Sequence, residues 1–428
     1  MSNINPSRLF FASCMALTVT SMTFAIRAGM VEPLGKEFGL SETQLGWIVG
    51  MAFFGFPVAT TLGGFIVDQI GMKRLMWVAF AAHLLGLVLT IFAGGFLTLM
   101  ISTFLIGFAN GMVEAVCNPL VASLYPNKKV VMLNKFHVWF PGGIVIGALL
   151  AAGMNAAKAH FGFESFLNWQ WQVGLILIPT LFYGWLFLGQ KFPRTERVEM
   201  GVSTGDMFKA AFTPLFLFLV VCMFFTANTE LSTNQWIDKL LGNAGANSLL
   251  ILALINGIMA FGRFFGEPII HKLNPTGVLL ISAILAAIGL FLLRSVEGNA
   301  LYAAAVIFAL GVCYFWPTML GYTSERVPKS GALGLSLMGG VGMLGNWAYQ
   351  TFFIGPKLDA EKAALTPGIQ ASKTAELTAQ GGDMSTLTEV VTKQVELLAG
   401  KEVLASINIL PLFLIVAFAG LWFVMRKK

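Results

Sequence analysis

Long apolar runs, separated by short polar segments, fill almost the whole chain. A membrane-spanning helix needs about 20 mostly apolar residues. Suitable runs are expected at residues 9–31, 44–66, 75–94, 98–124, 130–153, 169–190, 211–236, 247–270, 277–294, 299–322, 331–354 and 404–425. The first run contains Arg27 and lacks a small-residue cleavage site, so we expect a span and not a signal peptide. The pattern predicts an all-α membrane protein with twelve transmembrane helices.

Lysine and arginine are concentrated in every second loop. One set of loops holds Arg8, Lys73, Arg74, Lys128, Lys129, Lys191, Arg194, Arg197, Lys209, Lys272, Arg326, Lys329 and Arg426 to Lys428. The short loops on the opposite side hold only Lys36, Lys158, Lys239 and Arg294. By the positive-inside rule, the densely charged loops and both termini are expected in the cytoplasm. The net charge of +6 therefore reflects topology and indicates no nucleic-acid partner.

A polar, charged segment at 191–210 divides the apolar runs into two groups of six. We expect an N-terminal six-helix bundle (1–190), a cytoplasmic linker (191–210) and a C-terminal six-helix bundle (211–428). The second bundle carries an insertion at 356–403, rich in Ala, Thr, Lys and Glu, with weak helical periodicity at 387–398. We expect this insertion to be extracellular and flexible or partly helical.

The two halves resemble repeats of one another. Residues 62–74 close the second span, and residues 265–275 close the eighth span at the equivalent place. The fourth span has Glu114 and Pro119 where the tenth has Trp316 and Pro317. Repeated halves around a site near the membrane midplane are typical of secondary transporters.

The composition and motifs exclude most other functions. The chain is 57% hydrophobic and 11% charged, whereas soluble proteins have about 25% charged residues. No CxxC, HExxH or P-loop motif occurs, and the four cysteines all lie in apolar runs. We expect no enzyme activity and no cofactor or metal.

Glu114 is the main candidate for chemistry because it lies inside an apolar span. A carboxyl group there is unfavourable unless it faces a water-filled cavity or has a partner. The alternatives are a functional site and a structural pair with a neighbouring helix. Gly107 and Gly111 would let a neighbouring backbone approach this span closely, and Pro119 would free a carbonyl one turn earlier.

The loop after the second span carries a signature. The pattern Gly64-x3-Asp68-x2-Gly71-x-Lys73-Arg74 resembles the loop 2–3 motif of the major facilitator superfamily. The resemblance implies twelve helices in two pseudo-symmetric six-helix bundles that work by alternating access. It also implies a cytoplasmic gate that contains Asp68, Lys73 and Arg74. In the eighth span, Arg263 is expected to contact a carboxylate near the same side, with Glu325 as a candidate.

A second set of residues resembles the fucose/glucose–galactose permease group. These are Glu114-x3-Asn118-Pro119 and Leu133-Asn134-x2-His137, followed by Gly142 and Gly143. The resemblance implies that Glu114 couples transport to protons and that Asn118 shapes a sugar site. His137, a candidate for binding sugar hydroxyls or relaying protons, stands where the group has glutamine. Arg27 stands near an expected acidic residue of the first span.

Arg27 has three possible roles that the sequence leaves open. It could bind an anionic substrate as a planar fork, influence Glu114, or extend to the outer surface with Glu32 as its partner. Further binding candidates are polar or aromatic: Glu230, Asn234 and Gln235 at the outer end of the seventh span, and Trp316, Asn346 and Gln350 in later spans. Such groups suit a sugar, and we favour this role for the polar end of the seventh span over a span that simply ends at the interface.

These features predict a proton-coupled symporter for a small polar solute, preferably a hexose or related sugar. The alternatives are an organic-anion or sugar-acid carrier that uses Arg27, and a drug or lipid exporter. We expect a monomer in the cell membrane, with its lipid bilayer and small-molecule substrate as partners. H⁺ is the expected coupling ion, and Na⁺ stays open.

Overall fold

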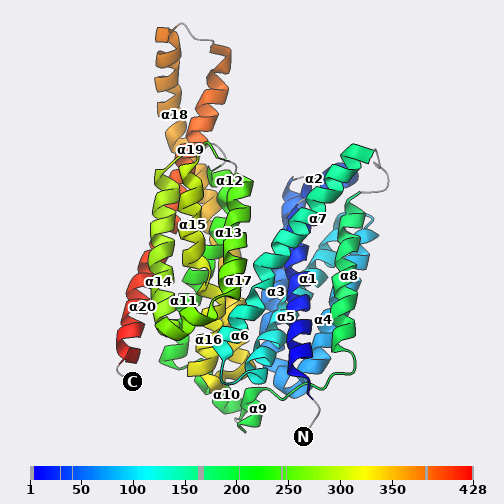
Figure 1. The fold of residues 1–428 in the computed structure, drawn as a ribbon. Helices are drawn as coiled ribbons and strands as arrows, with labels where there is room; N and C mark the ends of the chain where they lie inside the picture. The colour runs from blue at the N-terminus through cyan, green and yellow to red at the C-terminus, as the bar shows by residue number, and fades with distance from the viewer. Residues whose placement is uncertain are drawn as a thin grey trace. The chain divides into compact units, whose positions relative to one another are not determined.

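The computed structural model describes residues 4–28, 30–40, 42–161, 168–201, 203–241, 244–246, 248–380 and 384–426. Most residues of these ranges lie in helices, and the ranges contain no strand (Figure 1). The α-helices are α1 (Pro6–Ala28), α2 (Val31–Phe38), α3 (Glu42–Ile70), α4 (Met72–Ile91), α5 (Phe96–Leu124), α6 (Lys129–His137), α7 (Trp139–Phe161), α8 (Trp169–Phe187), α9 (Glu196–Glu199), α10 (Thr204–Ala211), α11 (Pro214–Ala227), α12 (Thr233–Leu241), α13 (Ser248–Phe264), α14 (Glu267–Ser295), α15 (Ala300–Val312), α16 (Phe315–Arg326), α17 (Gly331–Tyr349), α18 (Gly355–Gln380), α19 (Leu387–Ile407) and α20 (Ile409–Arg426). Shorter segments are the π-helices η1 (Asn228–Ser232) and η3 (Gln350–Ile354) and the 3₁₀-helices η2 (Pro328–Ser330) and η4 (Met384–Thr386).

Helices lie at every position where the sequence predicts a span. Within the described ranges, nine helical stretches are long and apolar enough to cross a membrane, and Leu250–Phe264 of α13 is a shorter apolar helix. α8 and α17 occupy the other two expected positions. The all-α membrane class is confirmed, and the exact number of twelve spans stays a prediction.

The chain folds into two compact units. The first unit contains Met1–Met223, Ala260–Pro275 and Trp316–Leu344. The second contains Phe224–Met259, Thr276–Phe315 and Gly345–Lys428. The expected division into halves on either side of the 191–210 linker stays a prediction.

Two glycines of α5 hold this helix against α3 in the first unit. A Cβ atom at Gly107 would overlap the backbone of Ala52, and one at Gly111 would overlap the carbonyl oxygen of Phe56. Small residues at both positions therefore allow backbone-to-backbone contact, as in many membrane helix pairs. The predicted close approach is confirmed, and it fixes the helix that carries Glu114.

In the second unit, the expected insertion forms a hairpin of two helices. α18 and α19 pack against each other and project beyond the other helices of this unit (Figure 1). Lys362 Nζ lies 3.4 Å from Glu396 Oε1 across the hairpin. The helical periodicity of 387–398 is confirmed by α19, but α18 is more regular than expected. Pairing with α19 and an i,i+4 ion pair between Lys357 and Glu361 support α18.

Candidate functional site

Glu114 and Asn118 lie one turn apart on α5, where side chains at i and i+4 meet. Asn118 Nδ2 donates a hydrogen bond to Glu114 Oε2 at 2.5 Å. Both residues are buried, and Glu114 is only 4% exposed. The spacing read from the sequence therefore produces a direct contact between the acid and the amide.

His137 adds an imidazole to this pair from the last position of α6. His137 Nε2 lies 3.1 Å from Asn118 Oδ1 and 3.9 Å from Glu114 Oε2. Because the Asn118 amide nitrogen donates to Glu114, its oxygen accepts from His137, and the proton of His137 is assigned to Nε2. Asn118 thus bridges the carboxyl group and the imidazole.

Arg263 reaches the same cluster from α13. It is 1% exposed, and its Nη1 donates to the backbone carbonyl of His137 at 3.2 Å. The sequence assigns Arg263 to a cytoplasmic gate with Glu325 as a partner. The described contact brings its positive charge to the helix end that carries His137, and both the Glu325 contact and the gating role stay predictions.

We call Glu114, Asn118, His137 and Arg263 the acid cluster. It combines one protonatable carboxyl group, a bridging amide, an imidazole and a guanidinium. As an anion, Glu114 can accept hydrogen bonds only, whereas a protonated carboxyl also carries a donor. A proton on Glu114 would therefore change the hydrogen bonds that run from Glu114 through Asn118 to His137.

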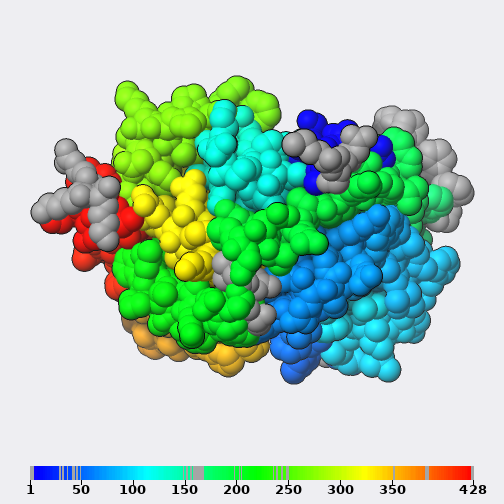
Figure 2. All heavy atoms as spheres, turned by 90° about the horizontal axis from the view of Figure 1, so that it is seen from below, coloured from blue at the N-terminus to red at the C-terminus, as the bar shows by residue number. Residues whose placement is uncertain are grey.

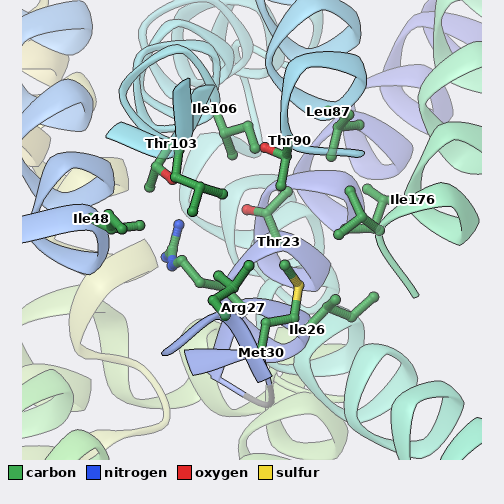
Figure 3. A pocket seen from close by; sticks show the side chains of 13 residues that line it. Thr23, Ile26, Arg27, Met30, Ile48, Leu87, Thr90, Thr103, Ile106 and Ile176 are labelled. Atoms are coloured by element: carbon green, nitrogen blue, oxygen red, sulfur yellow. The ribbon is translucent and has the colours of Figure 1, made fainter. Parts of the chain in front are cut away.

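Arg27 borders a separate cavity of the first unit. The cavity is lined by Thr23, Ile26, Arg27, Met30, Leu34, Ile48, Leu87, Thr90, Leu99, Thr103, Ile106, Val173 and Ile176 (Figure 3). The Arg27 guanidinium lies 4.9 Å from the ring centre of Phe24 and 5.9 Å from that of Phe53. These distances suit cation–π attraction. We call this space the Arg27 cavity.

Within the described residues, no carboxylate lies within 4.0 Å of the Arg27 guanidinium. The Glu32 side chain, one predicted partner, lies outside the described residues. The Glu114 side chain lies within the described residues, and it forms no ion pair with Arg27. Thr23, one turn before Arg27, contacts Asn110, which lies one turn before Glu114. Helical geometry thus places Arg27 and Glu114 about two turns, or roughly 11 Å, apart along the bundle.

A buried hydrogen-bonded chain ends at the Arg27 cavity and was not foreseen from the sequence. The Thr23 hydroxyl donates to the Thr20 carbonyl at 2.6 Å, so its oxygen accepts from Asn110 Nδ2 at 3.0 Å. Asn110 Oδ1 then faces His83 Nε2 at 2.7 Å, which must carry the proton. His83 Nδ1 accepts from the Tyr183 hydroxyl at 3.0 Å.

This relay, Tyr183–His83–Asn110–Thr23, joins α8, α4, α5 and α1. His83 and Asn110 are both 0% exposed. Their polar side chains inside apolar runs were a usable signal, since buried polar groups need partners. Only the partners could not be read from the sequence.

The second unit contains other predicted binding residues. Asn346 Nδ2 donates to Ser232 Oγ at 3.0 Å, and Glu230 and Asn346 are buried. Asn228 to Ser232 form the π-helix η1, a local form that often occurs at functional sites. Asn234 follows on α12 and is partly exposed.

Three predicted binding residues are not tested by these contacts. The side chains of Gln235 and Gln350 lie outside the described residues. Trp316 belongs to the first unit, is 6% exposed and packs near Gly339 of α17. All three stay candidates.

The predicted gate residues lie at one end of the first unit. Asp68 accepts a hydrogen bond from Thr195 of the linker, and Lys73 and Arg74 are exposed. Figure 2 shows the linker segment (green) on this face beside the blue helices α3 and α4.

Ion pairs surround the same end. Lys129 Nζ lies 2.6 Å from Glu196 Oε1. Glu267 pairs with Lys135 at 2.6 Å and with Lys128 at 3.4 Å. Lys135, two residues before His137, therefore has an acidic partner.

Comparison with solved structures supports the fold. The transporter FucP in its outward conformation is 16% identical and matches with a TM-score of 0.69, covering 95% of this chain and 98% of that one. The proton:xylose symporter XylE is 15% identical, with a TM-score of 0.70, 97% coverage of this chain and 95% of that one.

Comparison of sequences supports the family. A D-xylose transporter of Levilactobacillus brevis is 24% identical over 190 residues, which is 44% of this chain. The chain thus spans only 40% of that relative's length. The family model described as Major Facilitator Superfamily matches residues 9–348. Together with the helical fold, this match shows that the chain belongs to the Major Facilitator Superfamily, whose members are multi-pass membrane transporters and not enzymes.

Proposed function

We propose that this transporter couples the uptake of a small polar solute, a hexose or related sugar, to protons. It would act by alternating access in the cell membrane with both termini in the cytoplasm. The observation that carries the proposal is the buried acid cluster, in which Glu114 is linked through Asn118 to His137.

The acid cluster supports proton coupling because its members respond to the charge of Glu114. The carboxylate form accepts from Asn118 and is favoured by the positive charge of Arg263 on the adjoining helix. A neutral carboxyl group would depend less on the hydrogen bond from Asn118 and on the positive charge of Arg263. Separation of the helices that carry these groups would therefore favour a protonated Glu114, and their closure would favour release of the proton.

The sugar assignment has separate support. The relative in Levilactobacillus brevis is named a D-xylose transporter, and XylE is named a proton:xylose symporter. In this chain, Asn118, Asn346 and Glu230 are buried polar groups of the kind that hydrogen-bond sugar hydroxyls. Asp68, Lys73 and Arg74 are proposed to form the cytoplasmic gate.

The test compares the parent protein with Glu114→Gln in proteoliposomes. A pH gradient, inside alkaline, is imposed during uptake of D-xylose, D-galactose, D-glucose or D-glucuronate. The parent is expected to accumulate at least one of them, while Glu114→Gln only equilibrates it but still exchanges labelled for unlabelled solute. Glu402→Gln, at a half-exposed carboxylate of α19, is the matched control.

Two results would contradict the proposal. If the gradient drives equal accumulation in Glu114→Gln and the parent, Glu114 is not the coupling group. If a sodium gradient drives accumulation and a pH gradient does not, the coupling ion is Na⁺.

A further inference from the structure

The Arg27 cavity combines two hydrogen-bond donors for which the described residues supply no acceptor. Within the described residues, the Arg27 guanidinium has no acidic partner. The Thr103 hydroxyl has no hydrogen-bond partner among those residues either, although Thr103 is only 5% exposed. Buried polar groups normally have partners. Figure 3 shows the guanidinium extending towards Thr103 and Ile48 at the same cavity.

The shape and charge of these donors select one class of ligand. A guanidinium presents parallel N–H groups that match the two oxygens of a carboxylate, and a hydroxyl can donate to either oxygen. A neutral sugar hydroxyl would leave the positive charge uncompensated in surroundings made largely of Ile26, Leu87, Ile106 and Val173. A carboxylate would compensate it.

A second feature favours a hydroxyl group near that carboxylate. The Thr90 hydroxyl donates to the Gly86 carbonyl at 2.8 Å, so its oxygen faces the cavity as an acceptor. The Thr23 hydroxyl is similarly committed to Thr20 and Asn110. A hydroxyl oxygen that can accept a hydrogen bond, close to a guanidinium that can bind a carboxylate, suits the hydroxyl groups of a sugar acid or another hydroxy acid.

The size of the cavity limits which part of the solute enters. Its volume, counted as space open to the centre of a water molecule, is about 30 Å³. One water needs about 10–15 Å³ by this measure. The cavity therefore holds a carboxylate group, with the remainder of a sugar-sized solute outside it.

We propose that Arg27 and Thr103 form a subsite for the carboxylate of a hydroxy acid, so that the transporter prefers a sugar acid to the matching neutral sugar. This inference rests on the proposed function, because it names the substrate class of the same transporter. The Tyr183–His83–Asn110–Thr23 relay acts as a positioning device: it fixes Thr23, one turn from Arg27, against α5, which carries Thr103.

The test uses D-glucuronate and D-glucose, which share a ring and differ at the C6 carboxylate. Equilibrium binding of each to the purified full chain is measured for the parent, Arg27→Gln, Arg27→Lys, Thr103→Val and Thr103→Ser. Arg294→Gln, a partly exposed arginine of α14, is the control. A thermal unfolding curve for each variant shows that it is folded.

The parent is expected to bind D-glucuronate at least about tenfold more tightly than D-glucose, since hydrogen bonds to charged groups are the strong ones. Arg27→Gln should abolish the preference, and Arg27→Lys should retain part of it. Thr103→Val should weaken D-glucuronate binding severalfold, and Thr103→Ser should restore it. D-glucose binding should stay within about twofold in every variant.

Three outcomes would overturn the subsite. The first is a parent protein that binds D-glucose more tightly than D-glucuronate, and the second is equal binding of D-glucuronate by the parent, Arg27→Gln and Thr103→Val. The third is formate that binds through Arg27 without competing with D-glucuronate. The last result would assign the cavity to a free small anion. Failure of the proposed function looks different: D-glucuronate binds through Arg27, but no pH gradient drives its accumulation.

Discussion

The acid cluster and the Arg27 cavity are two buried polar regions of the first unit, and both use residues of α5. In the acid cluster, the protein supplies a partner for each polar group: Asn118 for Glu114 and His137 for Asn118. In the Arg27 cavity, Arg27 and Thr103 face open space. A cluster whose polar groups all have partners suits a carboxyl group that gains and loses a proton. Donors without acceptors suit the binding of a ligand from outside the protein.

The largest effect is expected from a change that removes the helix contact on which both regions depend. Gly111→Val would drive a branched side chain into the Phe56 carbonyl of α3. Overpacking of this kind costs about 1–3 kcal/mol or more, and here the obstacle is backbone. We expect little folded protein on size-exclusion chromatography and loss of both solute binding and transport.

Gly142 provides the matched control for that experiment. A Cβ atom there would meet no heavy atom within 4 Å in the described residues. Gly142→Val should therefore fold and bind solute nearly as the parent does. Equal behaviour of the two valine variants would show that the α3–α5 contact does not support the two regions.

The next largest effect should separate the regions. Arg263→Gln removes a positive charge from the acid cluster and weakens the bond to the His137 carbonyl. Accumulation driven by a pH gradient should fall by about tenfold or more, a loss typical of a charged hydrogen bond. D-glucuronate binding at equilibrium should stay within about twofold, because Arg27 is unchanged. A parallel loss of both would mean that the two regions form one site.

The sequence predicted contacts within a helix better than contacts between helices. The i,i+4 spacing placed Glu114 beside Asn118, and Gly107 and Gly111 correctly indicated a close neighbour. It could not assign Arg263 to His137, because 126 residues separate them. Helical periodicity identifies which residues share a face, but it does not say which helices become neighbours.

The same limit explains the relay. His83 and Tyr183 are 100 residues apart, and each alone resembles an isolated polar residue in an apolar span. Arg27 was the reverse case: its chemistry was evident, but the sequence left three roles open for it. The Arg27 cavity supports the proposed anion-binding role, whereas the role with Glu32 is not tested, because the Glu32 side chain lies outside the described residues.

A smaller effect is expected when the relay is cut at its far end. Tyr183→Phe removes the donor to His83 Nδ1 without changing the ring that packs against Phe80. A buried acceptor left without its partner costs about 1–3 kcal/mol. We expect a melting temperature lower by a few degrees and weaker D-glucuronate binding, with proton-driven accumulation of a neutral sugar unchanged.

The relay hypothesis also predicts how two changes combine. Thr23→Val cuts the near end of the same chain, and Thr23→Ser keeps the hydroxyl. Tyr183→Phe and Thr23→Val together should weaken D-glucuronate binding less than the sum of their separate effects, because residues of one network are not additive. Additive losses, or failure of Thr23→Ser to retain binding, would remove the positioning role.

The smallest effects are expected at Glu267, which lies outside both regions and pairs with two lysines. Lys135 Nζ is 2.6 Å from the carboxylate and the Lys135 side chain is 35% exposed. Lys128 Nζ is 3.4 Å away and the Lys128 side chain is 58% exposed. Exposed ion pairs contribute about 0–1 kcal/mol. Lys135→Gln should therefore lower the free energy of unfolding slightly, and Lys128→Gln should have almost no effect. At about 0.5 M salt the difference should disappear, because screening shortens the range of exposed charges to a few ångströms. Thermal unfolding of both variants at low and high salt measures this difference. A larger loss of stability in Lys128→Gln than in Lys135→Gln would show that exposure and distance do not predict which ion pair contributes more.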